Sequence, residues 1–188
     1  KAPQRGEDDI EKTKAWQRLL IDNAYAARTI PSEYGGGGMD TISYVLAMEE
    51  LSKVDASCSV IVSVNNSLVC WGLETFGNEE QKQKYLPACV SGEIVTAIAM
   101  TEPGTGSDLQ GMKTTAKKEG DDFVINGSKT FITNGQLADL VIVVAVTDPT
   151  AGAKGLSLIL VEANTPGFER GSNLAKIGMK SQDTSELF

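Results

Sequence analysis

A segment rich in glycine and hydroxyl side chains, Thr101–Asp108 with the sequence TEPGTGSD, carries the residue types that could bind an anion. Glycines let a backbone approach a ligand closely, and successive amides of a tight turn can point at a phosphate group. The segment follows an apolar run, Val95–Met100, whose length and composition predict a strand. An ordinary connection between strands would have a similar composition. A phosphate-binding loop and a plain turn therefore both stay open on these residues alone.

Two common phosphate-binding motifs are excluded by spacing. A dinucleotide fingerprint needs Gly-x-Gly-x-x-Gly at the start of a helix, and Gly104, Gly106 and Gly111 are spaced differently. A P-loop needs lysine directly after glycine, whereas the run GSKT at Gly127–Thr130 has an intervening serine. The chain contains no histidine, which excludes histidine-based triads and histidine metal ligands. We therefore predict no metal site.

The residues after the glycine-rich segment predict an antiparallel meander. Gly120–Asp122 is a turn signal in front of an apolar run at Phe123–Ile125. Asn126-Gly127 is a strong hairpin signal, because both residue types tolerate a positive φ angle. A new strand is therefore expected at Lys129–Thr133, antiparallel to the one before it.

Two long motifs, MTEPGTGSD and NGSKTFITNG, resemble the acyl-CoA dehydrogenase family in their order and separation. The resemblance extends from IPSEYGG near Pro31 to KIGMKSQDTSELF at the end of the sequence. Met100–Val146 is most similar to the long-chain branch, whereas VNNSL and FGNEEQKQKYLP are at least as similar to the short-chain branch. The resemblance leaves the preferred acyl chain length open.

The resemblance implies FAD as cofactor, bound by two segments. These segments contain Ile98, Met100, Thr101, Gly106 and Ser107, followed by Phe131, Ile132 and Thr133. Thr101 and Thr133 would place hydroxyls or amides at the edge of the isoalloxazine ring. Gly106 and Ser107 would face the pyrophosphate and the acyl-CoA substrate, so Ser107 is also a substrate-binding candidate. Phe131 stands where many relatives have tryptophan, which keeps an aromatic wall but lacks the indole N–H.

The resemblance also implies the reaction, in which an acyl-CoA thioester is oxidised to a trans-2-enoyl-CoA. A glutamate removes the α proton, hydride passes to flavin N5, and an electron-transferring flavoprotein takes up the electrons. Hydrogen-bond donors near N5 would stabilise the developing charge. Glu102 and Asp108 lie in the loop, but the family's base belongs to a C-terminal helical domain, and we expect these two residues to shape the loop. The base is expected beyond Phe188, so no catalytic residue is predicted in this chain, and the chain alone is expected to be inactive.

Two other functions fit the same residues. An acyl-CoA oxidase or a flavin monooxygenase would use the scaffold with oxygen as the electron acceptor. A non-catalytic fragment or assembly module would keep the fold without the chemistry, although the presence of Thr101, Ser107 and Thr133 argues against a decayed site. The resemblance implies that the complete protein is a homotetramer or a homodimer.

The first half of the chain predicts helices. Expected segments are Asp8–Ala27, Asp40–Val54, a second apolar helix from Asp55, and Glu79–Val90, capped by Asn78 and closed by Gly92. Local propensity favours a strand at Val60–Val64, but the resemblance favours helix. Asn65, Asn66 and Ser67 form a polar island there that is either structural or ligand-binding.

From Glu93 onward, a two-residue period with frequent turn signals predicts a sheet or barrel. Further strands are expected at Leu140–Val146, Leu156–Val161 and Ile177–Phe188. The fold prediction is α+β: a helical domain at residues 1–93, incomplete at its start, then an antiparallel β-barrel domain at residues 94–188. The C-terminal helical bundle of the family is absent from the sequence.

Composition narrows the partners. The net charge is −8 and the 17 basic residues are scattered singly, so nucleic acid is not an expected partner. Cys58, Cys70 and Cys89 form no CxxC pair and are expected to be reduced thiols. No signal peptide or membrane span is expected, since the start is charged and the apolar runs are short. Bacterial cytoplasm and mitochondrial matrix both fit.

Overall fold

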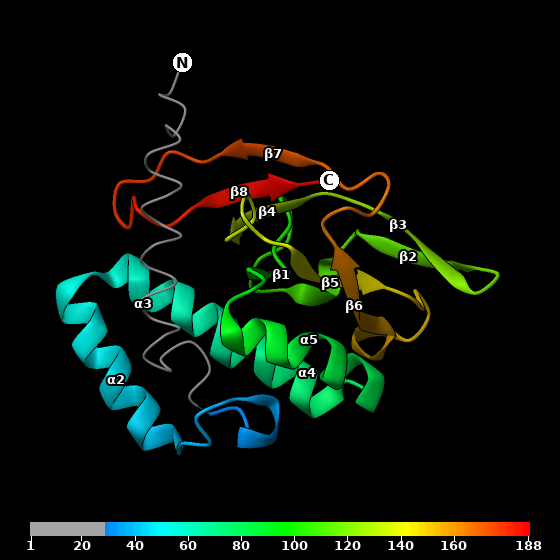
Figure 1. The fold of residues 1–188 in the computed structure, drawn as a ribbon. Coiled ribbons are helices and arrows are strands. Elements are labelled where there is room, and N and C mark those ends of the chain that lie inside the picture. Colours follow the sequence, from blue (N-terminus) through cyan, green and yellow to red (C-terminus); the bar gives the residue numbers. More distant parts are fainter. Residues whose placement is uncertain (1–28) are drawn as a thin grey trace. The chain divides into compact units, whose positions relative to one another are not determined.

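The computed structural model describes residues 29–188, which divide into two compact units (Figure 1). The helical unit consists of the residues up to Thr96 together with Ala175–Gln182. The β unit consists of Ala97–Leu174 and Asp183–Phe188. The helix expected at Asp8–Ala27 lies outside the described residues.

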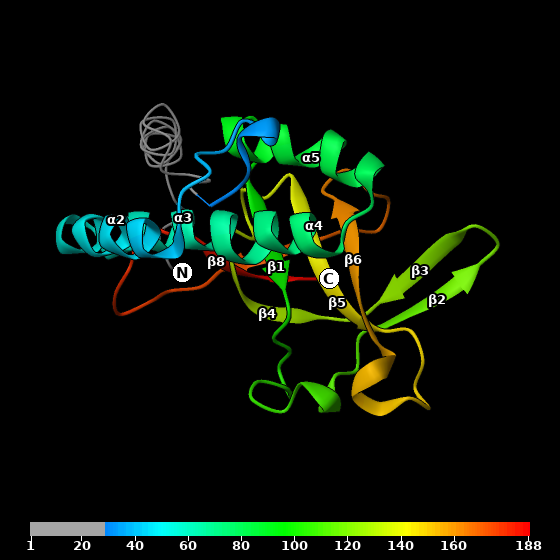
Figure 2. The same cartoon turned by 90° about the horizontal axis from the view of Figure 1, so that it is seen from below.

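The helical unit contains the helices that the sequence predicts in the described range. Their bounds are η1 Ser32–Tyr34, α2 Thr41–Val54, α3 Ala56–Ser63, η2 Val64–Cys70, α4 Trp71–Phe76 and α5 Glu79–Ser91. Figure 2 shows α3 and α4 on one continuous axis, with η2 as a π-helical segment between them. Val60–Val64 is therefore helical, against its local propensity, because a helix that is apolar on every side is stable when neighbours bury it.

The predicted caps are confirmed. Asp40 accepts a hydrogen bond from the Ser43 amide at 2.7 Å and so begins α2. Asn78 and Gln81 form a reciprocal capping box at the start of α5. Gly92 ends α5 with a φ angle of 68°, a conformation that glycine adopts without a steric penalty.

The polar island on the π-helical segment is structural. Its side chains bond to neighbouring parts of the helical unit: Asn65 to Thr96 and the Cys89 carbonyl, Asn66 to Thr29, and Ser67 to Tyr44. These bonds satisfy buried polar groups, as the structural interpretation requires.

One helical stretch of the described residues, Ala56–Phe76, is long and apolar enough to cross a membrane by length and composition. This result departs from the expectation based on single apolar runs, because the stretch joins several of them. Half of its most apolar window is buried inside the structure. Core helices of globular proteins pass the same test, so the stretch is weak evidence for a span.

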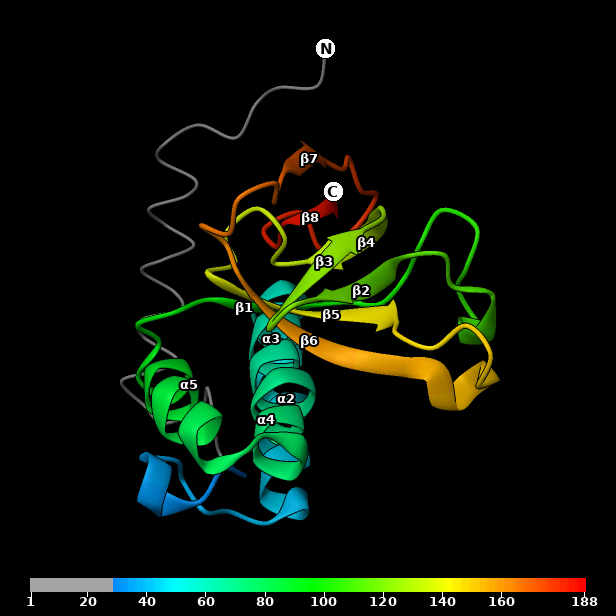
Figure 3. The ribbon, with the colours of Figure 1, turned by 90° about the vertical axis from the view of Figure 1, so that its right-hand side faces the viewer.

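The β unit is built from two sheets around one apolar core (Figure 3). One sheet contains β1 Thr96–Ala99, β5 Leu140–Val146, β2 Thr115–Glu119 and β3 Asp122–Asn126 in that order, with β6 Leu156–Glu162 paired to β5. The other contains β4 Lys129–Thr133, β8 Thr184–Leu187 and β7 Arg170–Asn173. The α+β class is confirmed. The two sheets of the described chain do not join into a closed sheet, so the predicted barrel is not confirmed.

The predicted meander is wrong at Asn126-Gly127. The hairpin lies one strand earlier, where β2 and β3 pair through a turn at Gly120 and Asp121 (Figure 2). After β3 the chain crosses to the other sheet, and β4 pairs with β8. Gly127 is needed for close packing, because a Cβ atom there would lie 2.2 Å from Thr114 Oγ1.

The last predicted strand is also too long. Of Ile177–Phe188, only Thr184–Leu187 is a strand, and the preceding residues form turns that belong to the helical unit. The expected strands at Leu140–Val146 and Leu156–Val161 are confirmed as β5 and β6, which pair antiparallel along their whole length.

Gly127 provides a test of this packing. We expect Gly127→Ala to lower the free energy of unfolding by about 1 to 3 kcal/mol, because Thr114 is buried and cannot move aside freely. Gly106→Ala is the matched control, since nothing lies within 4 Å of a Cβ atom at that position. Denaturant unfolding of both variants measures the difference, and equal stability of the two would contradict the packing role.

Candidate functional site

Strand β1 separates its side chains between the core and a more open face. Ala97 and Ala99 are fully buried in the core of the β unit. Ile98 and Met100, which alternate with them, are half-buried. Thr96, on the same face as Ile98, is buried, so this face is partly exposed only at Ile98 and at Met100 just after the strand.

The glycine-rich segment is a tight turn with a fixed base and an open tip. Glu102 and Thr105 exchange two backbone hydrogen bonds of 3.0 and 3.1 Å, and both residues are buried. Gly106 and Ser107 are exposed just after this bridge, and a Cβ atom at Gly104 or Gly106 would meet nothing within 4 Å. The turn can therefore present its backbone to a large ligand.

Strand β4 holds an aromatic ring outside the core. Phe131 is 67% exposed and has a φ angle of 58°, in the left-handed region that aromatic residues rarely adopt. The β4–β8 register shifts between Lys129 and Ile132, and such irregularities turn a side chain away from its regular direction. Ile132 lies in the core, so only its backbone can contact a ligand, whereas Thr133 is half-buried. A strained, exposed aromatic residue is a marker of a functional surface.

The two predicted cofactor segments meet at one backbone hydrogen bond. The Thr130 amide donates to the Thr101 carbonyl at 2.9 Å. Phe131 follows Thr130 directly, so the aromatic residue and the glycine-rich turn begin from the same point of the β unit. The structure thus brings together segments that are about thirty residues apart in the sequence.

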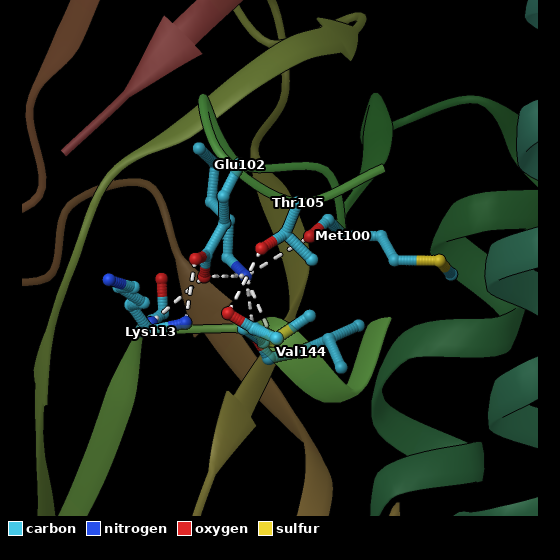
Figure 4. A network of polar contacts seen from close by, with 9 residues as sticks. Met100, Glu102, Thr105, Lys113 and Val144 are labelled. Atoms are coloured by element: carbon cyan, nitrogen blue, oxygen red, sulfur yellow. Dashed lines mark hydrogen bonds and ion pairs between the residues drawn. The ribbon is translucent and has the colours of Figure 1, made fainter. Parts of the chain in front are cut away.

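A buried ion pair lies beneath this junction. Lys129 Nζ is 3.0 Å from Glu102 Oε1, and the two side chains are 4% and 5% exposed. The ammonium also donates to the carbonyls of Met100 and Val144 at 3.2 and 2.7 Å and lies 3.3 Å from Met112 Sδ. Figure 4 shows these contacts converging between Glu102, Met100 and Val144.

The same contacts decide the charge of Glu102. Burial raises the pKa of this carboxyl, but hydrogen bonds from Thr114, the Lys113 amide and Lys129 outweigh burial and lower the pKa to about 2. Burial lowers the pKa of Lys129, and Glu102 counteracts that effect. A carboxylate that is ionised and engaged in several hydrogen bonds is a weak base, so the contacts of Glu102 are consistent with the expected role in shaping the loop.

The acid dependence of stability follows from this pKa. The ordinary pKa of this carboxyl is 4.5, and in the folded protein the pKa is about 2. Between these two pH values Glu102 is protonated in the unfolded chain and ionised in the folded protein. The contribution is therefore complete above pH 4.5 and is lost as the pH falls towards 2. We expect this group to account for about 3 kcal/mol of the acid destabilisation. Between pH 4.5 and pH 2, Glu102→Gln should lose about 3 kcal/mol less stability than the wild type, and an equal loss in the two proteins would contradict the assignment.

Asp108 also has a structural role. Its carboxylate accepts a hydrogen bond from the Gln110 amide at 3.2 Å and begins the short helix η3, Leu109–Gly111. The expectation that both acidic residues of the loop shape its conformation is therefore consistent with their contacts.

Sequence analysis missed two residues that support the site. Lys129 had no local signal, since its partner Glu102 lies 27 positions away. Asp183 is buried and accepts a hydrogen bond from the Gln136 amide at 2.7 Å, while its carbonyl accepts one from the Asn134 amide. Asp183 thereby fixes the turn that follows Thr133.

The thiols do not form a site in the described residues. Cys58, Cys70 and Cys89 are free, and Cys70 and Cys89 are buried. Burial raises the pKa of Cys58, which disfavours the reactive thiolate. Among residues 29–188, no group of three or more acidic, cysteine or histidine side chains could hold a metal ion.

Comparison with known families matches both halves of the chain. Residues 2–93 match the acyl-CoA dehydrogenase N-terminal domain, and residues 97–188 match the acyl-CoA dehydrogenase middle domain. The chain is 46% identical over 186 residues to the short-chain specific acyl-CoA dehydrogenase of Clostridium acetobutylicum, covering 95% of this chain and 48% of the relative. It is 47% identical over 161 residues to the mitochondrial long-chain specific enzyme of Mus musculus, covering 85% and 37%. The chain spans less than half the length of these relatives, and it resembles both branches equally.

Solved structures match the fold closely. The acyl-CoA dehydrogenase of Geobacillus kaustophilus is similar with a TM-score of 0.89 and 46% identity, over 96% of this chain and 49% of that chain. The enzyme of Bacillus anthracis, solved in complex with FAD, has a TM-score of 0.86 and 32% identity, over 96% of this chain and 30% of that chain.

Proposed function

Because this chain belongs to the acyl-CoA dehydrogenase family, we propose that it supplies part of the FAD site of an enzyme that oxidises an acyl-CoA thioester to a trans-2-enoyl-CoA. The observation that carries the proposal is the exposed ring of Phe131, held in a left-handed conformation one residue from the bond between Thr130 and Thr101. A left-handed conformation costs free energy at a non-glycine residue, and such strained residues cluster at ligand-binding sites.

The β unit has the types of residue that FAD binding requires. An isoalloxazine ring needs a flat apolar surface, which Phe131 offers, and donors along its edge, which Thr101 and Thr133 can provide. A pyrophosphate needs backbone amides that it can approach closely, and Gly106 and Ser107 lie exposed after an open turn. The relative from Bacillus anthracis, whose structure contains FAD, supports the same assignment.

The proposed roles of the chain are binding and orientation. When bound, FAD supplies the redox chemistry by accepting a hydride from the substrate. Thr101 and Thr133 direct hydroxyls or amides at the ring edge and stabilise the charge that develops there. Phe131 excludes water from one side of the ring, and Ser107 contacts the acyl-CoA. We assign the base that removes the α proton to none of the described residues, since Glu102 is already engaged.

The partners follow from the same proposal. We propose an acyl-CoA thioester as substrate, an electron-transferring flavoprotein as acceptor, and assembly as a homotetramer or homodimer. We propose the bacterial cytoplasm or the mitochondrial matrix as the compartment, since either would contain the substrate and the acceptor. The equal similarity to short-chain and long-chain relatives leaves acyl length to experiment.

Anaerobic titration of the FAD-loaded complete protein with butyryl-, octanoyl- and palmitoyl-CoA tests the activity. We expect the visible flavin band to bleach with at least one of them, and the most effective thioester reports the acyl preference. If the reduced flavin consumes oxygen rapidly once air is admitted, the protein is an oxidase or a monooxygenase instead. A flavin that stays oxidised with all three thioesters would contradict the proposed function.

A further inference from the structure

Lys129 contacts the residues on both sides of Thr101. Its ammonium donates to the Met100 carbonyl at 3.2 Å and to the Glu102 carboxylate at 3.0 Å. The next residue of β4, Thr130, donates its amide to the carbonyl of Thr101 itself at 2.9 Å. Three consecutive residues at the start of the glycine-rich turn are therefore bonded to two consecutive residues of β4.

The attachment extends to the rest of the β unit. Lys129 Nζ also donates to the Val144 carbonyl on β5 at 2.7 Å, which fixes the ammonium itself. Glu102 accepts the amides of Lys113 and Thr114 at 2.7 and 2.9 Å, so its carboxylate is held from the opposite side. Neither charged side chain has freedom to move without breaking several bonds at once.

This arrangement is not needed for folding alone. An apolar side chain of similar volume fills a buried position without removing a charge from water, and buried ion pairs are often no more stabilising than such a replacement. The three N–H groups of the buried ammonium match three oxygen acceptors, on Met100, Glu102 and Val144, and such directed bonds fix geometry. Thr101 lies between two residues that Lys129 holds, Met100 and Glu102, and its own carbonyl is held by the Thr130 amide.

We propose that Lys129, together with Glu102, is a positioning pair that sets where Thr101 lies relative to the flavin ring. The pair itself is buried and does not touch the cofactor. It acts through the backbone on both sides of Thr101. This inference rests on the proposed FAD site and adds residues that support it from beneath.

A double-mutant cycle tests the proposal on the complete protein. FAD is removed, and its dissociation constant is measured by flavin fluorescence for the wild type, Thr101→Ala, the pair variant Lys129→Met/Glu102→Gln, and all three changes combined. We expect the pair variant and Thr101→Ala each to weaken FAD binding about tenfold, as for one lost hydrogen bond. The combined variant should be no weaker than Thr101→Ala, because the pair acts through that residue. The absorption band of bound flavin should change in the same way in both variants.

Lys113→Met is the matched control. It removes an exposed ammonium by the same chemical change, while the backbone amide of residue 113 still donates to Glu102. Its FAD dissociation constant should stay within about twofold of the wild type, since surface charges of this kind have small effects. Cooperative thermal unfolding of each apo variant establishes that it is folded.

The outcomes separate the two proposals. Wild-type protein that does not bind FAD contradicts the proposed function itself. Two results would overturn the positioning role alone, given wild-type protein that binds FAD. In one, the pair variant binds FAD as tightly as the wild type. In the other, the losses of FAD affinity in the pair variant and in Thr101→Ala multiply in the combined variant. If the pair variant does not fold, Glu102→Gln replaces it, and a loss that persists undiminished in the Thr101→Ala background overturns the proposal in the same way.

Discussion

Lys129→Met alone should lower the free energy of unfolding by about 3 to 5 kcal/mol. The variant leaves the Glu102 carboxylate buried without its cation, while the amides of Lys113 and Thr114 still donate to it. The carbonyls of Met100 and Val144 lose a charged donor as well. Denaturant unfolding at neutral pH measures the change.

The pair variant Lys129→Met/Glu102→Gln is the control for this prediction. With the charge removed from both partners, no unpaired ion remains buried. The amides of Lys113 and Thr114 donate to separate oxygens of Glu102, so the single carbonyl oxygen of glutamine can accept from one of them. We therefore expect it to regain most of the stability that Lys129→Met loses. Equal losses in the single and the pair variant would mean that packing, and not the buried charge, dominates at this position.

Phe131→Ala should weaken FAD binding roughly 10- to 100-fold, the range expected when a stacked aromatic side chain is removed. The same substitution should change the stability of the apo protein little, because the ring is 67% exposed. Phe131→Gly should weaken FAD binding as much as Phe131→Ala does. Its free energy of unfolding should be about 1 kcal/mol higher than that of Phe131→Ala, since glycine adopts a φ angle of 58° without strain. Flavin fluorescence titration and denaturant unfolding give the two numbers.

Phe123→Ala is the matched control for Phe131. Phe123 is also exposed, at 48%, but it lies in the regular hairpin strand β3, away from the junction of the two cofactor segments. FAD affinity should not change. A loss of affinity at Phe123 as large as that at Phe131 would contradict the assignment of the binding face.

Local signals in the sequence predicted the helical unit well. Asn78 and Gln81 are three residues apart, and the side chain of each accepts a hydrogen bond from the backbone amide of the other. Their spacing in the sequence is therefore enough to predict the cap. Asp40 acts in the same way for α2. Such contacts are short in sequence, and propensity and pattern are sufficient to find them.

The β unit was predicted less completely, because its contacts are distant in sequence. Asn126-Gly127 has the composition of a hairpin, yet the chain crosses between sheets there, where Gly127 packs against the buried side chain of Thr114. The Lys129–Glu102 pair joins residues 27 positions apart. No single-sequence rule links them, since an isolated lysine in a strand is more often exposed.

The candidate site shows the same division. The residue types of Thr101–Asp108 and the motif around Phe131 pointed to these two segments through a family resemblance, and the folded chain joins the segments at the bond from Thr130 to Thr101. The left-handed conformation of Phe131 and the backbone bond from Thr130 to Thr101 could not be read from residue types. They depend on the β-sheet irregularity between Lys129 and Ile132, which only the folded chain reveals.

The visible absorption spectrum of the purified complete protein, with and without added FAD, shows whether the protein binds a flavin. We predict a flavin band that is shifted from that of free FAD and that stays with the protein through gel filtration. The shift should be lost in Phe131→Ala. A colourless protein whose added FAD separates completely on the column, with the spectrum of free FAD, would contradict the assignment of these residues to a flavin site.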